Sequence, residues 1–135
     1  MNIPFTSPKY FLGALIPNVK VLSATIDAII ASFTKGAVTQ LTSIATPVTL
    51  NTPTGVITTV ALTTAAGAVS GPFVVNNSKV LANSVVVASV EYAFNKTGSP
   101  VVQVEAVTSG KFKLKIGNAG SVVLNDIVKI HYIVI

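Results

Sequence analysis

Few side chains in this sequence belong to the types that catalyse reactions. The 135 residues include one histidine, no cysteine and four acidic residues, which are Asp27, Glu91, Glu105 and Asp126. A Ser-His-Asp arrangement would need His131 as the base and either Asp27 or Asp126 to orient it. The sequence lacks the strand–turn–helix nucleophile motif that presents the serine in such enzymes. We therefore predict that His131 is a half-exposed residue of a strand, beside Lys129.

The same small inventory can be tested for other kinds of site. Glu91 and Glu105 could lie on neighbouring strands and imitate the carboxylate pair of a glycoside hydrolase. The chain has no tryptophan, however, which leaves little surface for stacking on a sugar. The scattered acids form no calcium loop, one histidine without cysteine forms no zinc site, and glycine-rich phosphate loops are absent. The sequence predicts a protein that is not an enzyme, with no catalytic residue, no cofactor and no metal.

The basic residues point to a different kind of surface. All nine are lysines, and the formal net charge is +5 at pH 7. Nucleic-acid recognition favours arginine, so no direct nucleic-acid partner is predicted. Lys111, Lys113 and Lys115 alternate with apolar residues, which in a strand places the lysines together on one face.

These three lysines are the candidate docking face, for an acidic surface beneath the protein. Glu105, on the strand before, is an acidic neighbour that would face them across a hairpin. The alternative is a solvated face that blunts an edge strand and discourages association between sheets.

The amino-acid composition limits the classes of protein to which this chain can belong. Hydrophobic residues make up 50% of the chain and charged residues 10%, against an ordinary charged share of about 25%. Mean hydropathy is +0.72, yet the apolar runs are shorter than the ~20 residues of a membrane span. The N-terminus lacks the basic segment of a secretory signal, so synthesis in a cytoplasm and no membrane partner are expected. Self-association would cover this apolar surface, and we predict an obligate homotrimer.

The chain divides near Pro47 into an arm and a domain. Residues 1–46 predict an N-terminal extended arm, punctuated by prolines and packed on neighbouring chains. Apolar residues at spacings of three and four predict one short helix at about 23–34, capped by Ser23 and ended by Lys35 and Gly36. The β-branched residues of this stretch leave a strand over 20–35 as an open alternative.

Residues 47–135 predict an all-β domain, because Val and Thr dominate and turn residues recur about every ten positions. The predicted architecture is an antiparallel β-sandwich or a jelly-roll-like domain. The expected strands are Val48–Asn51, Val56–Leu62, Phe73–Asn76, Ser84–Phe94, Val101–Thr108, Lys111–Asn118 and Ile127–Val134.

Four segments of this domain carry a resemblance to a known family. They are GPFVVNNSKVLANSVVV at 71–87, GSPVVQV at 98–104, GKFKLKIGN at 110–118 and LNDIVKIHYIVI at 124–135. Together they resemble a β-domain of tailed-bacteriophage virion proteins, which occurs in small head decoration (cement) proteins and in tail-fibre tips, often as trimers. The resemblance covers roughly residues 54–135 and implies no catalytic residue.

The resemblance implies a structural role in a virion. The expected function is that of a capsid decoration (cement) protein that binds and stabilises the assembled phage head. The expected partners are other copies of the chain and the major capsid protein lattice or other virion proteins, at the capsid surface. A tail-fibre or receptor-binding (adhesin) module is the alternative.

Overall fold

The computed structural model describes residues 19–30 and 33–135. Contacts divide the chain into two compact units, Met1–Phe33 and Thr34–Ile135, and each is considered by itself. In the first unit residues 19–30 form an α-helix, so the helix alternative holds for this part of 20–35. The helix begins before Ser23, which therefore does not cap it, because its apolar stripe already starts at Val19. The prolines of the predicted arm all fall within residues 1–18, and these positions lie outside the described residues.

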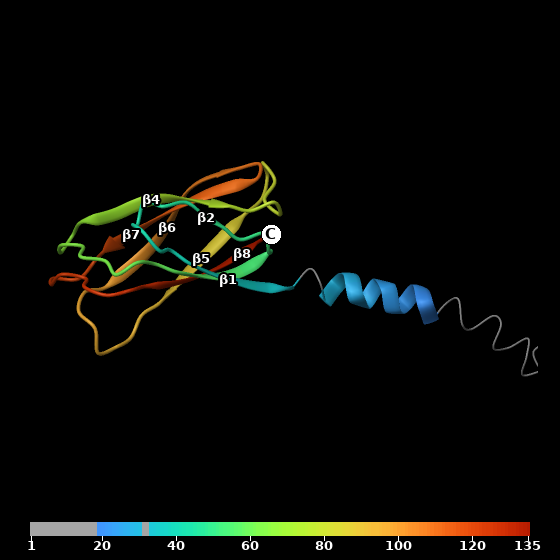
Figure 1. Ribbon diagram of the computed structural model, residues 1–135, viewed down its shortest axis with the longest axis horizontal. Helices are drawn as coiled ribbons and strands as arrows, with labels where there is room; N and C mark the ends of the chain where they lie inside the picture. The colour runs from blue at the N-terminus through green and yellow to red at the C-terminus, as the bar shows by residue number, and fades with distance from the viewer. Residues whose placement is uncertain (1–18, 31–32) are drawn as a thin grey trace, which may run out of the picture. The chain divides into compact units, whose positions relative to one another are not determined.

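The second unit is a β-sandwich, and its layers of strands are visible in Figure 1. Within residues 34–135 it contains eight strands, which are β1 (Lys35–Thr39), β2 (Val48–Thr49), β3 (Thr54–Thr58), β4 (Val69–Asn76), β5 (Val86–Glu91), β6 (Pro100–Thr108), β7 (Lys111–Asn118) and β8 (Lys129–Val134). One sheet has the order β1-β3-β8-β5 and the other β2-β4-β7-β6. The predicted all-β sandwich is confirmed.

Strand direction follows from the path of the chain between the two sheets. The chain alternates between the sheets from β1 to β4, so β3 returns beside β1 and β4 beside β2, each in parallel. The remaining pairs, β3–β8, β5–β8, β4–β7 and β6–β7, are antiparallel. The sandwich is therefore antiparallel at its centre and has one parallel pair at one edge of each sheet.

The compact unit takes in residues 34–46, which the sequence analysis assigned to the arm. Strand β1 pairs with β3 along its whole length, from Lys35 opposite Thr54 to Thr39 opposite Thr58. Gln40 follows this strand and is buried. These residues therefore pack on their own domain, and the Lys35-Gly36 pair begins a strand because its partner lies elsewhere in the chain.

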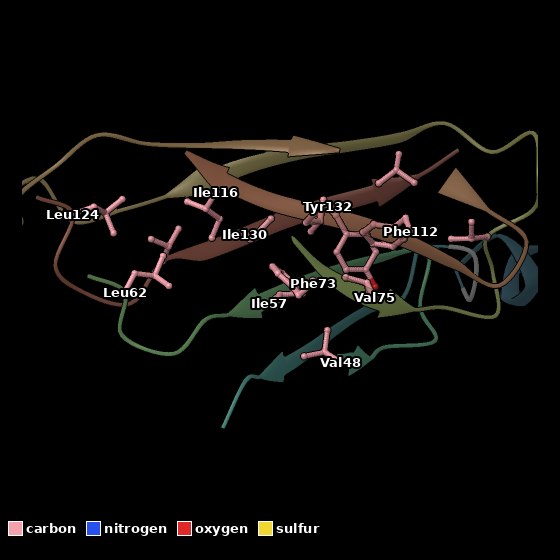
Figure 2. Close-up of a cluster of buried hydrophobic side chains, with 14 residues drawn as sticks. Val48, Ile57, Leu62, Phe73, Val75, Phe112, Ile116, Leu124, Ile130 and Tyr132 are labelled. Carbon is pink, nitrogen blue, oxygen red and sulfur yellow. The ribbon is translucent and has the colours of Figure 1, made fainter. Parts of the chain in front are cut away.

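The core lies between the two sheets and is built by alternation along the strands. Inward-facing side chains of β4, β7, β3 and β8 are fully buried, as Figure 2 shows for Phe73, Ile57, Ile116 and Ile130 among others. The rings of Phe112 and Tyr132 meet edge to face across the layers, with centroids 5.2 Å apart. Burial of such side chains provides the main stabilisation of a domain of this size.

Candidate functional site

The three candidate lysines lie on the outer face of strand β7, as predicted. Lys111 and Lys113 are exposed and Lys115 is half-buried, while Phe112, Leu114 and Ile116 are buried on the other face. Strand β7 lies between β4 and β6, however, and is not an edge strand. The interpretation of the lysines as an edge-blunting device is therefore wrong, because they occupy the middle of a sheet face.

The neighbours of the lysines on this face are polar at its two ends. Lys111 lies opposite Asn76 on β4 and Thr108 on β6, and Lys115 lies opposite Gln103, whereas Lys113 lies between Val74 and Ala106. We call Lys111, Lys113 and Lys115, with these neighbours, the lysine face. Its three lysines make it positively charged, which suits an acidic partner surface.

Glu105 faces the lysine face, as the hairpin predicts. The register of β6 and β7 shifts between Val104 and Ala106, so Glu105 lies at an interruption of the regular pairing between these two strands. Its Oε1 lies 3.9 Å from Lys115 Nζ. Among the described residues Lys111 and Lys113 form no ion pair. Two of the three lysines thus keep their charge available to a partner.

The outer face of the other sheet carries a second charged cluster, centred on Glu91. His131 Nε2 donates to Glu91 Oε2 at 2.6 Å, and Lys129 Nζ lies 3.4 Å from Glu91 Oε1. The hydrogen bond from His131, followed by that from Lys129, lowers the pKa of Glu91. The register of β5 and β8 creates this cluster by pairing Glu91 with Lys129. Sequence reasoning placed His131 beside Lys129 but missed Glu91, since its strand ends forty residues earlier.

Of the two acid partners proposed for His131, Asp126 pairs with a different residue. Asp126 forms an ion pair with Lys96, and this contact lowers the pKa of Asp126 and raises that of Lys96. Asp27 belongs to the helix of the other unit. Ser89 is the cross-strand neighbour of His131, but among the described residues no hydrogen bond joins their side chains. Within residues 34–135, a serine, His131 and Asp126 are therefore not brought together as a Ser-His-Asp arrangement requires.

The proposed carboxylate pair is not formed either. Glu91 ends β5 in one sheet, whereas Glu105 belongs to β6 in the other, and both side chains are exposed on outer surfaces. Within the described residues no group of three or more His, Asp or Glu side chains is placed to hold a metal ion. Among the described residues, no helix is long and apolar enough to cross a membrane.

An open cavity of about 540 Å³ lies beside the Glu91 cluster. Glu91 and Lys129 border it on one side, and the Lys96–Asp126 ion pair borders it on another. Phe94, in the loop between β5 and β6, lines it and is fully exposed. The cavity combines an aromatic surface with charged groups that already have partners in the chain.

Comparison of the chain with protein-family models, with curated proteins and with solved structures finds no match.

The lowered pKa of Glu91 predicts a pH dependence of stability. Its ordinary value is 4.5, and the folded value lies below it. Stability from the pairing is therefore present above pH 4.5 and is lost as the pH falls through the folded value. Urea unfolding at pH 7 and pH 3 is expected to show that Glu91→Gln destabilises the domain less at pH 3. An equal difference between variant and parent at both pH values contradicts the role of the Glu91 charge.

Proposed function

We propose that the chain is a non-enzymatic structural protein of a virus particle, a decoration protein that binds and stabilises the assembled head as a homotrimer. The virion setting is supported by the resemblance of residues 54–135 to the β-domain of tailed-bacteriophage virion proteins. The proposed partners are other copies of the chain and the capsid lattice.

One observation carries the assembly role. The sandwich has a complete core of its own, in which Ile57, Leu114 and Ile130 are fully buried. The helix over 19–30 leaves its large apolar side chains exposed, among them Ile26 at 47% and Leu22 at 59%. A soluble protein rarely exposes such a row unless another molecule covers it. We infer that contact with other chains covers this exposed row.

The particle itself tests this function. Cryo-electron microscopy of the native virion is expected to show the sandwich on the outer surface of the head, in many copies. Binding assays with purified components are expected to show that the protein binds assembled heads but not free capsid subunits. Absence of the protein from purified particles, or its presence at the tail tip alone, contradicts the decoration role.

The lysine face gives a prediction about docking. Changing Lys111, Lys113 and Lys115 to Gln is expected to weaken binding to heads and to reduce its salt dependence. Exposed charge pairs contribute about 0–1 kcal/mol each, so the face steers and orients docking. Cosedimentation with heads over a range of salt concentrations measures the effect, and circular dichroism checks the fold.

The matched control removes the same charge elsewhere. Lys20, Lys35 and Lys79 are exposed and lie outside the lysine face. Changing these three to Gln is expected to alter head binding less than the first triple variant. If both triple variants weaken binding equally, net charge matters and the lysine face has no special role.

The alternative function is a tail-fibre or receptor-binding module, and the cavity beside Phe94 favours it. Aromatic side chains are enriched at the surfaces where proteins bind other proteins. This function predicts that the isolated protein binds host cells and that Phe94→Ala reduces this binding. The decoration function predicts no binding to host cells.

A further inference from the structure

The helix over 19–30 carries an apolar stripe with the spacing of a coiled-coil seam. Val19, Leu22, Ile26 and Ile29 alternate at spacings of three and four, and Phe33 continues the sequence pattern. With Val19 assigned to heptad position a, these residues fall at a, d, a, d and a. Because successive residues are about 100° apart around the axis, the first four of these side chains fall within an arc of about 80° on one side of the helix.

The remaining positions of the helix agree with this assignment. Lys20 and Asp27, its two charged residues, both fall at position b, away from the stripe. Ala24 falls at f, on the opposite side of the helix. Thr25 falls at g, and its hydroxyl donates to the carbonyl of Val21 at 3.0 Å, within the helix itself. The two charged residues thus lie off the apolar stripe, and Val21, at position c, is an exposed apolar residue outside it.

The apolar stripe is self-complementary, which selects identical helices as its partner. The a and d side chains of one helix fit between those of a second copy in register, without any polar or charged group in the seam. Val19 at a with Leu22 at d is a combination that favours two strands, whereas Ile at both a and d, as at Ile26 and Ile29, favours more than two. Ile30 at position e widens the seam beyond the narrow stripe of a two-stranded coil.

We propose that residues 19–30 of three copies form a parallel bundle along this stripe, and that this bundle is the interface of the homotrimer. The inference rests on the self-association in the proposed function and is independent of the virion setting. A helix of this length is marginal when isolated in water. The helix and the trimer are therefore expected to form together, whereas the sandwich folds by itself.

A charge in the seam tests the interface. Ile26→Asp is expected to convert a trimer into a monomer in sedimentation equilibrium at micromolar concentration. Thermal unfolding of the sandwich is expected to stay unchanged, because its core lies in the other unit. Val21→Asp is the matched control, since Val21 is also exposed and apolar but falls at position c. This variant is expected to remain trimeric.

Cysteine cross-linking tests the parallel arrangement, because the natural chain contains no cysteine. Leu22→Cys places a thiol at position d, where copies of a parallel bundle bring it together. It is expected to form disulfide-linked pairs on mild oxidation, at least ten times faster than Ala24→Cys on the outer side. Equal rates for the two variants contradict the seam.

Two further outcomes overturn the proposal. One is an intact protein that is monomeric or dimeric at all concentrations tested, and the other is a trimer that Ile26→Asp leaves intact. The proposed function fails separately, if a trimer with the expected response to Ile26→Asp does not bind heads. Failure of the interface and failure of the virion role are therefore distinguishable.

Discussion

Replacing Asn118 with alanine is expected to lower the free energy of unfolding by about 3–4 kcal/mol. Asn118 ends strand β7 and is 2% exposed. Its Nδ2 donates to the carbonyls of Thr64 and Val122 at 2.9 and 2.8 Å. Its Oδ1 accepts from the backbone N–H groups of Ser99 and Gly120 at 2.9 and 3.0 Å. One side chain thus satisfies backbone groups of three different loops, and alanine would leave all of them without this partner.

Urea unfolding followed by far-ultraviolet circular dichroism measures this effect as a shift of the midpoint. Asn76→Ala is the control, because Asn76 is an exposed asparagine of β4 in the same sheet. Its effect is expected to stay within about 0.5 kcal/mol, as for most surface substitutions. A loss below 1 kcal/mol for Asn118→Ala would falsify the view that this side chain holds the loops together.

Replacing Leu114 with alanine is expected to cost about 2–5 kcal/mol, through lost burial and the cavity left behind. Leu114 is 0% exposed, on the inner face of β7. It lies in register with Phe73 on β4 and Val104 on β6, so neighbours on both sides hold the surrounding backbone in place. The cavity can therefore collapse only in part, and the loss is expected towards the upper end of this range.

Lys113→Ala is the matched control, because it removes a side chain from the opposite face of the same strand. Lys113 precedes Leu114 and is exposed on the outer face, so its loss is expected to change stability by less than about 0.5 kcal/mol. Differential scanning calorimetry of both variants gives the two values side by side. A stable Leu114→Ala variant together with an unfolded Lys113→Ala variant means that the faces are inverted.

Local pattern was enough to predict much of the sandwich. The alternation in Lys111–Asn118 predicted the bounds of β7 and both of its faces, because a strand has a period of two and one side must be buried. The turn at Ser109 and Gly110 predicted the hairpin that brings Glu105 towards Lys115. The apolar spacing of three and four predicted the helix that the structure places at 19–30.

Long-range pairing decided the rest. Strand β1 has no strong pattern of its own and becomes a strand because Thr54–Thr58 offers it a parallel partner. The middle position of β7, which excludes an edge role for its lysines, depends on β4 and β6 together. Glu91 meets His131 only because β5 and β8 are adjacent in the other sheet. The period of a strand is a local property that sequence carries, whereas the identity of its neighbours depends on how the whole chain minimises its exposed apolar surface.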